Sequence, residues 1–347
     1  MVKTQRRIQS MTEEGFPEQT DEDVAPVQRR KAALWQRTLP WLITVACFAY
    51  LYTKVDAAAA REQMTLFSYL GRVFARVDWW RWLMLMVPYS VFFFLVDTLV
   101  IWRVVNWFNT RVPYRDMMPV RGSSYILSII NEQVGKGAMA LYLYRKFGVP
   151  GWEVGSSMLF VMFCEFYYLL AWATLGWSLR RESLPAEFVL IPYIAGIASL
   201  FFIFWIWIFR SGSPPVDPAE HPDSKPAFRD RPVFKAFREA NPIQYLIVVI
   251  IRSPALIAAV FVYTWALGLF GVQVSFGEML GYLPVIFFGA ATPGPMRTVA
   301  ITLWVVLFPG HPGEMAAFGF VQHNFFIFFN AAIGLLFLRR ANRELFS

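Results

Sequence analysis

Charged residues are scarce in this chain of 347 residues: Asp, Glu, Lys and Arg together make up only 16% of it. A soluble domain carries about 25% charged and about 45–50% apolar residues, whereas 57% of this chain is hydrophobic. A wholly water-soluble protein is therefore excluded. The sequence predicts an all-α polytopic integral membrane protein, because its apolar runs approach the roughly 20 residues that a helix needs to cross a bilayer.

Cysteine and histidine are also scarce, with two and three residues. Cys47 and Cys164 lie inside apolar runs and form neither a disulfide framework nor a metal pattern. His221, His311 and His323 are too scattered for a metal cluster, so no metal and no cofactor are expected. The net charge of +8 does not indicate a nucleic-acid partner, because Lys and Arg lie mainly between apolar runs and at the chain ends, where they fix membrane orientation.

Short signatures of membrane enzymes are absent as well. The chain has no paired aspartate motif of the phosphatidyl-transferase kind, no H-E-x-x-H, no G-x-S-x-G and no P-loop. Because many membrane enzymes lack short motifs, enzymatic activity stays open, with a non-enzyme favoured.

Six apolar runs are predicted to cross the membrane as helices. They divide the chain into a first membrane half, 39–209, and a second, 243–347, joined by a polar cytoplasmic loop over 210–242. Residues 1–38 are polar, mixed in charge and predicted to be a disordered cytoplasmic tail. Basic residues before the first run and after the last favour cytoplasmic N- and C-termini. The spans are about 39–52, 83–102, 154–177, 188–209, 242–270 and 316–338.

Two further segments, 122–147 and 277–308, each consist of two short apolar halves around a break. The first break reads NEQVGKG over 131–137, and the second reads ATPGP over 291–295. Each half is too short to span, so each segment is predicted to be a re-entrant hairpin or a broken helix. Such backbone is tolerated only where protein or a watery cavity surrounds it.

An internal repeat is indicated by a shift of 161 residues, which superposes the two broken segments. Lys136 then falls on Arg297 and Glu153 on Glu314, whereas Glu165 falls on Phe326. If neither broken segment crosses, the first enters from the cytoplasm and the second from outside. The halves would then form an inverted repeat, which many transporters use to expose one site alternately to each side.

Three acids and three bases lie at membrane depth, which indicates mutual neutralisation. A lone charge at the bilayer centre costs at least ~2.5 kcal/mol, so such residues mark function or lock helices together. For Asp97 and Arg252 both roles stay open. Arg121, one of four arginines that follow the second span, is instead assigned to the cytoplasmic edge. The acids are Asp97, Glu132 and Glu165, and the bases are Lys136, Arg252 and Arg297.

Lys136 and Arg297 each lie beside a break, where free N–H groups of the next half-helix add positive potential. Together they suit an anionic headgroup. The predicted headgroup site comprises these two residues and Asn131, Gly135, Gly137, Thr292 and Gly294. The residues predicted to balance charge or relay a proton are Glu132, Glu165, Asp97 and Arg252.

The stretch 131–170, NEQVGKGAMALYLYRKFGVPGWEVGSSMLFVMFCEFYYLL, resembles the first signature of the flippase-like transmembrane domain of the lysylphosphatidylglycerol synthases. Residues 271–338, which include FGEMLGYLPVIFFGAATPGPMRTVAI, are similar to its second signature. The chain departs from the family at Ala138, where a glutamate is usual, and at Phe166, where an arginine is usual. These departures bear on the substrate more than on the fold.

The resemblance implies a bacterial inner-membrane protein that moves an anionic or modified phospholipid, or a lipid-linked intermediate, between leaflets. Membrane lipids would be its partners. The chain ends nine residues after Leu338, so the soluble synthase domain of that family is expected to be missing, and no synthase activity is expected.

Two other functions remain open. One is a membrane-embedded lipid-modifying enzyme, in which Glu132, Glu165 or His323 would be the general base. The other is a structural partner in an envelope complex, with the 210–242 loop and the N-terminal tail as docking sites for another protein.

Overall fold

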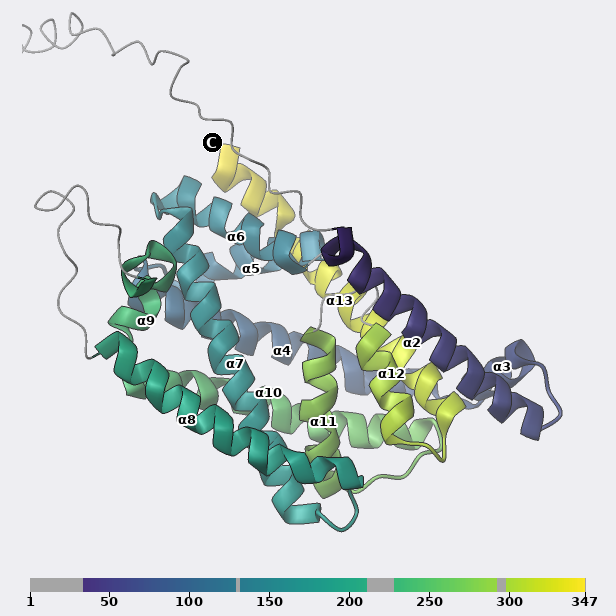
Figure 1. The fold of residues 1–347 in the computed structure, drawn as a ribbon. Coiled ribbons are helices and arrows are strands. Elements are labelled where there is room, and N and C mark those ends of the chain that lie inside the picture. The colour runs from purple at the N-terminus through teal and green to yellow at the C-terminus, as the bar shows by residue number, and fades with distance from the viewer. Residues whose placement is uncertain (1–33, 129–131, 211–227, 292–297, 347) are drawn as a thin grey trace, which may run out of the picture. The chain divides into compact units, whose positions relative to one another are not determined.

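The structure is a computed structural model that describes the main chain of residues 34–128, 132–210, 228–291 and 298–346. Within these ranges the chain forms helices and no strands (Figure 1). One compact unit comprises Ile43–Ser347, and Leu34–Leu42 belongs to another. Within these ranges the structure does not describe the side chains of residues 34–40, 128, 132–134, 136, 228, 291 and 339–346.

Six helices are long and apolar enough to cross a membrane, which confirms the six predicted spans and the fold class. The first is longer than the predicted run over 39–52, because the helix continues through a stretch of alanines, which favour helix. The six helices are α2 (Leu34–Arg61), α4 (Trp79–Phe108), α7 (Gly151–Arg180), α8 (Leu190–Arg210), α10 (Pro242–Leu269) and α13 (Pro312–Phe346).

Two of the long helices begin where the sequence supplies caps. Asp78 precedes α4, and its carboxylate accepts the Arg81 N–H at 3.0 Å. Asn241 precedes α10 and forms a capping box with Gln244, whose side-chain oxygen accepts the Asn241 N–H at 2.7 Å. Pro242 occupies the first turn of α10, where its missing N–H costs nothing.

Both broken segments are pairs of short helices. At 10 to 16 residues, each is about 15–24 Å long, less than the ~30 Å hydrocarbon core. The first begins at Tyr114 rather than at 122, since the Pro113 carbonyl accepts the Asp116 and Met117 N–H groups and starts the helix there. The four helices are α5 (Tyr114–Ser128), α6 (Glu132–Phe147), α11 (Phe276–Ala291) and α12 (Thr298–Leu307).

The order of helices repeats along the chain. A long helix, two short ones and a long one occur as α4–α7 and again as α10–α13, and α7 and α13 begin 161 residues apart, at Gly151 and Pro312. The main packing also repeats, because α5 packs on α13 while α11 packs on α7. Of the six long helices α4 is the second and α10 the fifth. If every long helix crosses once and the short helices do not cross, these two run in opposite directions, as an inverted repeat requires.

Glycines permit the two equivalent crossings. A Cβ on Gly176 of α7 would lie 2.5 Å from the main-chain nitrogen of Gly281 on α11, and a Cβ on Gly334 of α13 would clash with the carbonyl oxygen of Gly122 on α5. Small residues let membrane helices approach closely, and van der Waals packing then holds them together. Both contacts join one repeat to the other.

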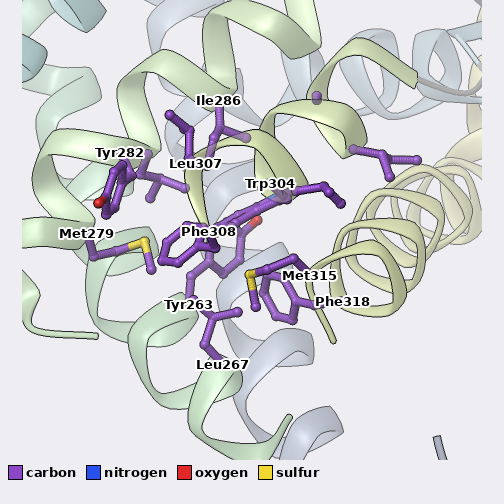
Figure 2. Close-up of a cluster of buried hydrophobic side chains, with 14 of the residues drawn as sticks. Tyr263, Leu267, Met279, Tyr282, Ile286, Trp304, Leu307, Phe308, Met315 and Phe318 are labelled. Atoms are coloured by element: carbon purple, nitrogen blue, oxygen red, sulfur yellow. The ribbon is translucent and has the colours of Figure 1, made fainter. Parts of the chain in front are cut away.

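Aromatic side chains fill the core of the second repeat. Trp304 of α12 is fully buried between Phe318 of α13, at 5.0 Å between ring centroids, and Tyr263 of α10, at 6.3 Å. Figure 2 shows these rings converging from three helices. Edge-on contacts of this kind are favourable, so the cluster fixes the position of Tyr263, whose ring extends toward the first repeat.

A short peripheral helix precedes the first long helix of each repeat: α3 (Leu66–Arg76) before α4, and α9 (Lys235–Glu239) before α10. Lys235 donates to Glu153 at the start of α7, at 2.5 Å. Tyr69 donates to Glu314 at the start of α13, at 3.4 Å. Burial, and then the Glu314 carboxylate, raise the pKa of Tyr69 to about 12, so the phenol stays protonated and remains the donor. Glu153 and Glu314 are the pair that the 161-residue shift superposes.

The 210–242 region is not a polar loop throughout. Residues 211–227 lie outside the described part of the chain, but from Phe228 the chain forms two short 3-10 helices, Phe228–Asp230 and Pro232–Phe234, and then α9. Phe237 is buried against α7 and α8, 5.3 Å from the ring of Trp205. Aromatic residues therefore anchor this segment despite its charges. One further 3-10 helix, Ala186–Val189, leads into α8.

Candidate functional site: a charged cavity between the repeats

A cavity of about 180 Å³ lies among six helices. The helices form three repeat-equivalent pairs: α4 with α10, α5 with α11, and α7 with α13. In the described part of the chain, the charged residues that line it are Asp97, Arg121, Glu165 and Arg252, and we call this space the charged cavity.

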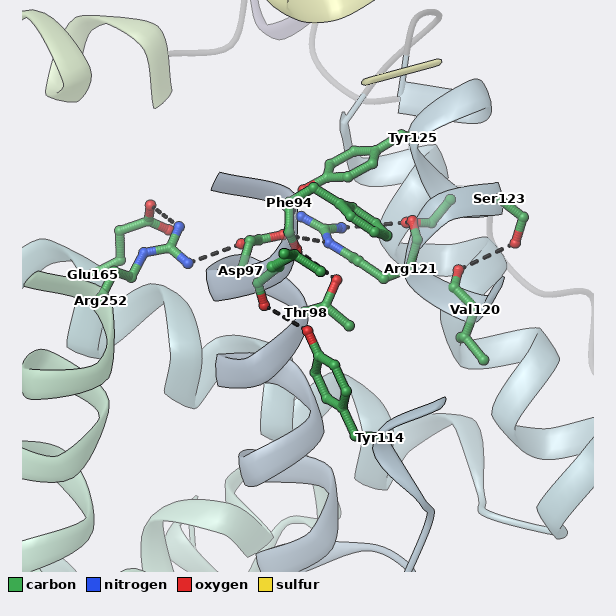
Figure 3. A network of polar contacts seen from close by, with 12 residues as sticks. Phe94, Asp97, Thr98, Tyr114, Val120, Arg121, Ser123, Tyr125, Glu165 and Arg252 are labelled. Carbon is green, nitrogen blue, oxygen red and sulfur yellow. Dashed lines mark hydrogen bonds and ion pairs between the residues drawn. The ribbon is translucent and has the colours of Figure 1, made fainter. Parts of the chain in front are cut away.

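Asp97 is the most enclosed of these groups, with a side chain only 4% exposed. Its Oδ2 accepts hydrogen bonds from Arg121 Nε and from the Tyr125 hydroxyl, both at 2.6 Å. Its Oδ1 accepts one from Arg252 Nη1 at 2.8 Å. Figure 3 shows the two guanidinium groups approaching this carboxylate from opposite sides. Three donors compensate the cost of burying its charge.

Arg252 joins two carboxylates. While Nη1 donates to Asp97, Nη2 donates to Glu165 Oε1 at 2.5 Å (Figure 3). The guanidinium is planar and always charged, so one side chain can hold two acids in a fixed arrangement. Ion pairs thus join three of the charges predicted to lie at membrane depth, and the Arg121 guanidinium supplies the second positive charge that balances the two acids.

Glu165 differs from Asp97 in its exposure. Its side chain is 38% exposed although α7 is one of the membrane-spanning helices, and it lines the charged cavity. This carboxylate is thus the acid of the network that a molecule inside the cavity can reach.

The sequence predicts Arg121 at the cytoplasmic edge of the membrane, but protein encloses most of its side chain. Its side chain is 12% exposed and bound to Asp97, and its guanidinium lies over the Tyr125 ring, 4.4 Å from the centroid. Arg121 and Tyr125 are four residues apart, so they share one face of α5. Neither residue was included in the site predicted from the sequence, although their four-residue spacing indicates that they share a helix face.

Helix α13 adds amide and imidazole groups to the cavity. Gln322, His323 and Asn330 line it and are all at least 95% buried. Gln322 Nε2 donates to the Tyr263 hydroxyl. Among the described residues, Gln322 Oε1 and Asn330 Oδ1 have no hydrogen-bond partner. Buried polar atoms are normally satisfied, so these two acceptors suit water or a ligand with donor groups.

Gly135 and Gly137, the two described residues of the predicted headgroup site, are not among the residues that line the cavity. Gly135 is buried in α6, and Gly137 is exposed with open space around its Cα. Ala290, near the end of α11, lines the cavity, as does Tyr125 of α5. Both short helices therefore reach the cavity just before the breaks that follow them. Of the residues that the sequence predicted for the site, those outside the described part of the chain are Asn131, Thr292, Gly294 and Arg297, together with the side chains of Glu132 and Lys136.

The described charges of the cavity sum to zero, with two arginines and two acids. Guanidinium groups bind carboxylate and phosphate oxygens with directed hydrogen bonds. Because both arginines are already paired with acids, an oxyanion ligand would have to take the place of one of these acids. Comparison of the chain with protein-family models, with curated proteins and with solved structures finds no match.

Proposed function

We propose that this protein moves a lipid with an anionic or modified headgroup, or a lipid-linked intermediate, between the leaflets of a bacterial inner membrane. One observation carries the proposal: three pairs of repeat-equivalent helices surround the charged cavity. In an inverted repeat, the two halves can exchange conformations and so expose one site to each side in turn.

The size and chemistry of the cavity support a headgroup as the bound part. About 180 Å³ accommodates a compact polar group but not a pair of acyl chains, which would stay in the surrounding bilayer. Arg252 and Arg121 supply donors for a phosphate, and the unpaired oxygens of Gln322 and Asn330, without partners in the described part of the chain, suit hydroxyl or amine groups.

The resemblance to the flippase-like domain of the lysylphosphatidylglycerol synthases supports the same proposal. Membrane lipids would be the partners, with both termini in the cytoplasm. With no P-loop in the sequence, movement would be coupled to an ion gradient or run to equilibrium.

The test is leaflet exchange in liposomes. We expect reconstituted protein to accelerate exchange of a fluorescent anionic phospholipid and Arg252→Lys to slow it, because lysine keeps the charge but loses the fork. Arg181→Gln is the matched control, since Arg181 is an exposed arginine outside the cavity. Exchange equal to that of protein-free liposomes would refute the proposal. Conversion of the lipid to a new product in detergent, where leaflets do not exist, would indicate an enzyme instead.

A further inference from the structure

The two acids bound to Arg252 are not equivalent. Asp97 is 4% exposed and held by donors from two other helices, whereas Glu165 is 38% exposed and meets Arg252 through a single nitrogen. Removing Asp97 from the network would break three hydrogen bonds. Moving Glu165 away would break one, and this carboxylate already faces the cavity.

We propose that Arg252 is an anion-binding residue and that Glu165 is its exchangeable counter-ion, which an oxyanion ligand displaces as Glu165 takes up a proton. The carboxylate oxygen of Glu165, 2.5 Å from Arg252 Nη2, occupies the place of a ligand oxygen. The inference rests on the proposed function for the identification of the anion as a lipid headgroup. The binding step itself does not require a membrane.

The charge of the cavity sets the proton count. With two arginines and two acids, the described groups are neutral. A phosphodiester would add one negative charge to a site where uncompensated charge is costly. Protonation of Glu165 removes one negative charge, so the sum over the described groups and the ligand stays at zero when one monoanion and one proton enter together. The proton comes from solvent and remains on the Glu165 carboxyl group while the anion is bound.

Other titratable groups face Glu165 from the neighbouring helices. The charged ones are Asp97 on α4, Arg121 on α5 and Arg252 on α10, and His323 faces the cavity from α13. Among the described cavity residues α11 contributes Phe287 and Ala290, which do not titrate. Because His323 belongs to the residue type that ordinarily titrates near neutral pH, His323→Gln is a necessary control. Phenols and thiols ordinarily titrate at higher pH; those nearby are Tyr89, Tyr125, Tyr168, Tyr263 and Cys164.

The experiment is calorimetric titration of the full-length protein in detergent. The probe is dihexanoyl phosphatidylglycerol, a monoanion, with dihexanoyl phosphatidylcholine for comparison. Repeating the titration in buffers with different ionisation enthalpies gives the number of protons taken up. We expect about one proton per anion, and an affinity that rises as pH falls, by about tenfold per pH unit where one proton is taken up with each anion.

Variants assign the proton and the anion. Glu165→Gln should bind the anion without proton uptake and with little pH dependence, whereas Arg252→Lys should lose at least tenfold in affinity. The exposed Glu182→Gln should keep the proton uptake of the wild type. Loss of the uptake in His323→Gln but not in Glu165→Gln would assign the proton to the imidazole and overturn the inference. A Glu165→Gln protein with unchanged uptake, or normal anion affinity in Arg252→Lys, would overturn the inference. Thermal unfolding of each variant shows whether it is folded.

The same data separate this inference from the proposed function. Anion binding with proton uptake but without leaflet exchange would leave the anion site standing and refute lipid transport. Leaflet exchange that is independent of pH and unaffected by Glu165→Gln would support lipid transport and refute the exchange of Glu165 for an anion. Titration with inorganic phosphate distinguishes the sources of the anion: equal affinity indicates a soluble oxyanion, and weaker binding indicates a lipid headgroup. Either result supports the site at Arg252.

Discussion

Replacement of Asp97 by asparagine tests whether the network is a structural requirement of the bundle. The change keeps the size of the side chain but removes the charge that Arg121 and Arg252 share. Two buried guanidinium groups would then have Glu165 as their one remaining described acid. Breaking a buried ion pair by removing one partner costs about 3–5 kcal/mol, and Asp97 has two such partners, so the upper part of this range is expected.

This cost should be visible as a fall in thermal stability. For chains at the upper end of the surveyed sizes, 1 kcal/mol shifts the midpoint by about 2 °C, so we expect Asp97→Asn to lower it by about 8–10 °C. The assay is the temperature at which the purified protein loses its monodisperse peak in detergent. Glu165→Gln serves as the matched variant, because its exposed carboxylate has one partner and its loss should lower the midpoint by at most ~2 °C.

The result that refutes this reasoning is a small shift for Asp97→Asn, equal to that of Glu165→Gln. The double variant Asp97→Asn/Arg252→Gln gives an independent check. It leaves Arg121 and Glu165, one charge of each sign, so its destabilisation should be smaller than the sum of the two single changes. Additive effects would mean that the two side chains do not interact energetically.

Three further predictions concern packing and caps outside the charged cavity. Gly176→Val should destabilise the protein by about 1–3 kcal/mol, because its side chain would meet the main chain of α11; Gly155→Val on the same helix, with open space around it, should be close to neutral in the same thermal assay. Lys235→Met removes the ion pair with Glu153 and should speed amide hydrogen exchange in α9 while costing at most ~1 kcal/mol; unchanged exchange would mean that the pair does not hold this helix. The main-chain N–H and the hydroxyl group of Ser275 donate to the Glu278 carboxylate and hold its pKa below the usual range. Because this folded-state pKa is depressed, its stabilising contribution is present above the unfolded pKa and is lost as pH falls through the folded one. Glu278→Gln should therefore destabilise the protein at neutral pH and match the wild type in acid, and a deficit that persists in acid would contradict this.

The membrane-spanning helices were predictable because their signal is long and local. A run of about 20 apolar residues has few structural interpretations. The breaks at 131–137 and 291–295 could be recognised by their polar, glycine and proline residues. The same local logic fails at Arg121. An arginine shortly after a span is usually a charge at the membrane edge, and only the return of α5 toward the bundle brings it to Asp97.

The partners within the site are a tertiary property. The sequence identified Asp97, Glu165 and Arg252 as charges that need compensation, but 155 residues separate Arg252 from Asp97, and nothing local says which acid it meets. The segment after Phe228 shows the opposite case. Its arginines and lysine favoured a polar loop, whereas phenylalanines at 234 and 237 decide its packing.

The arrangement of helices is repeated in this protein, but the acids of the charged cavity are not. The residue equivalent to Asp97 in the second repeat is Ala258, and the residue equivalent to Glu165 is Phe326. The ion pair between Asp97 and Arg121 lies within the first repeat, on α4 and α5, whereas both ion pairs of Arg252 join the second repeat to the first. A ligand anion that displaces Glu165 therefore loosens one of these two links and leaves the other in place. A ligand shifts a conformational equilibrium only by interacting differently with the two states, and an oxyanion at Arg252 acts on a contact that changes whenever one repeat moves against the other.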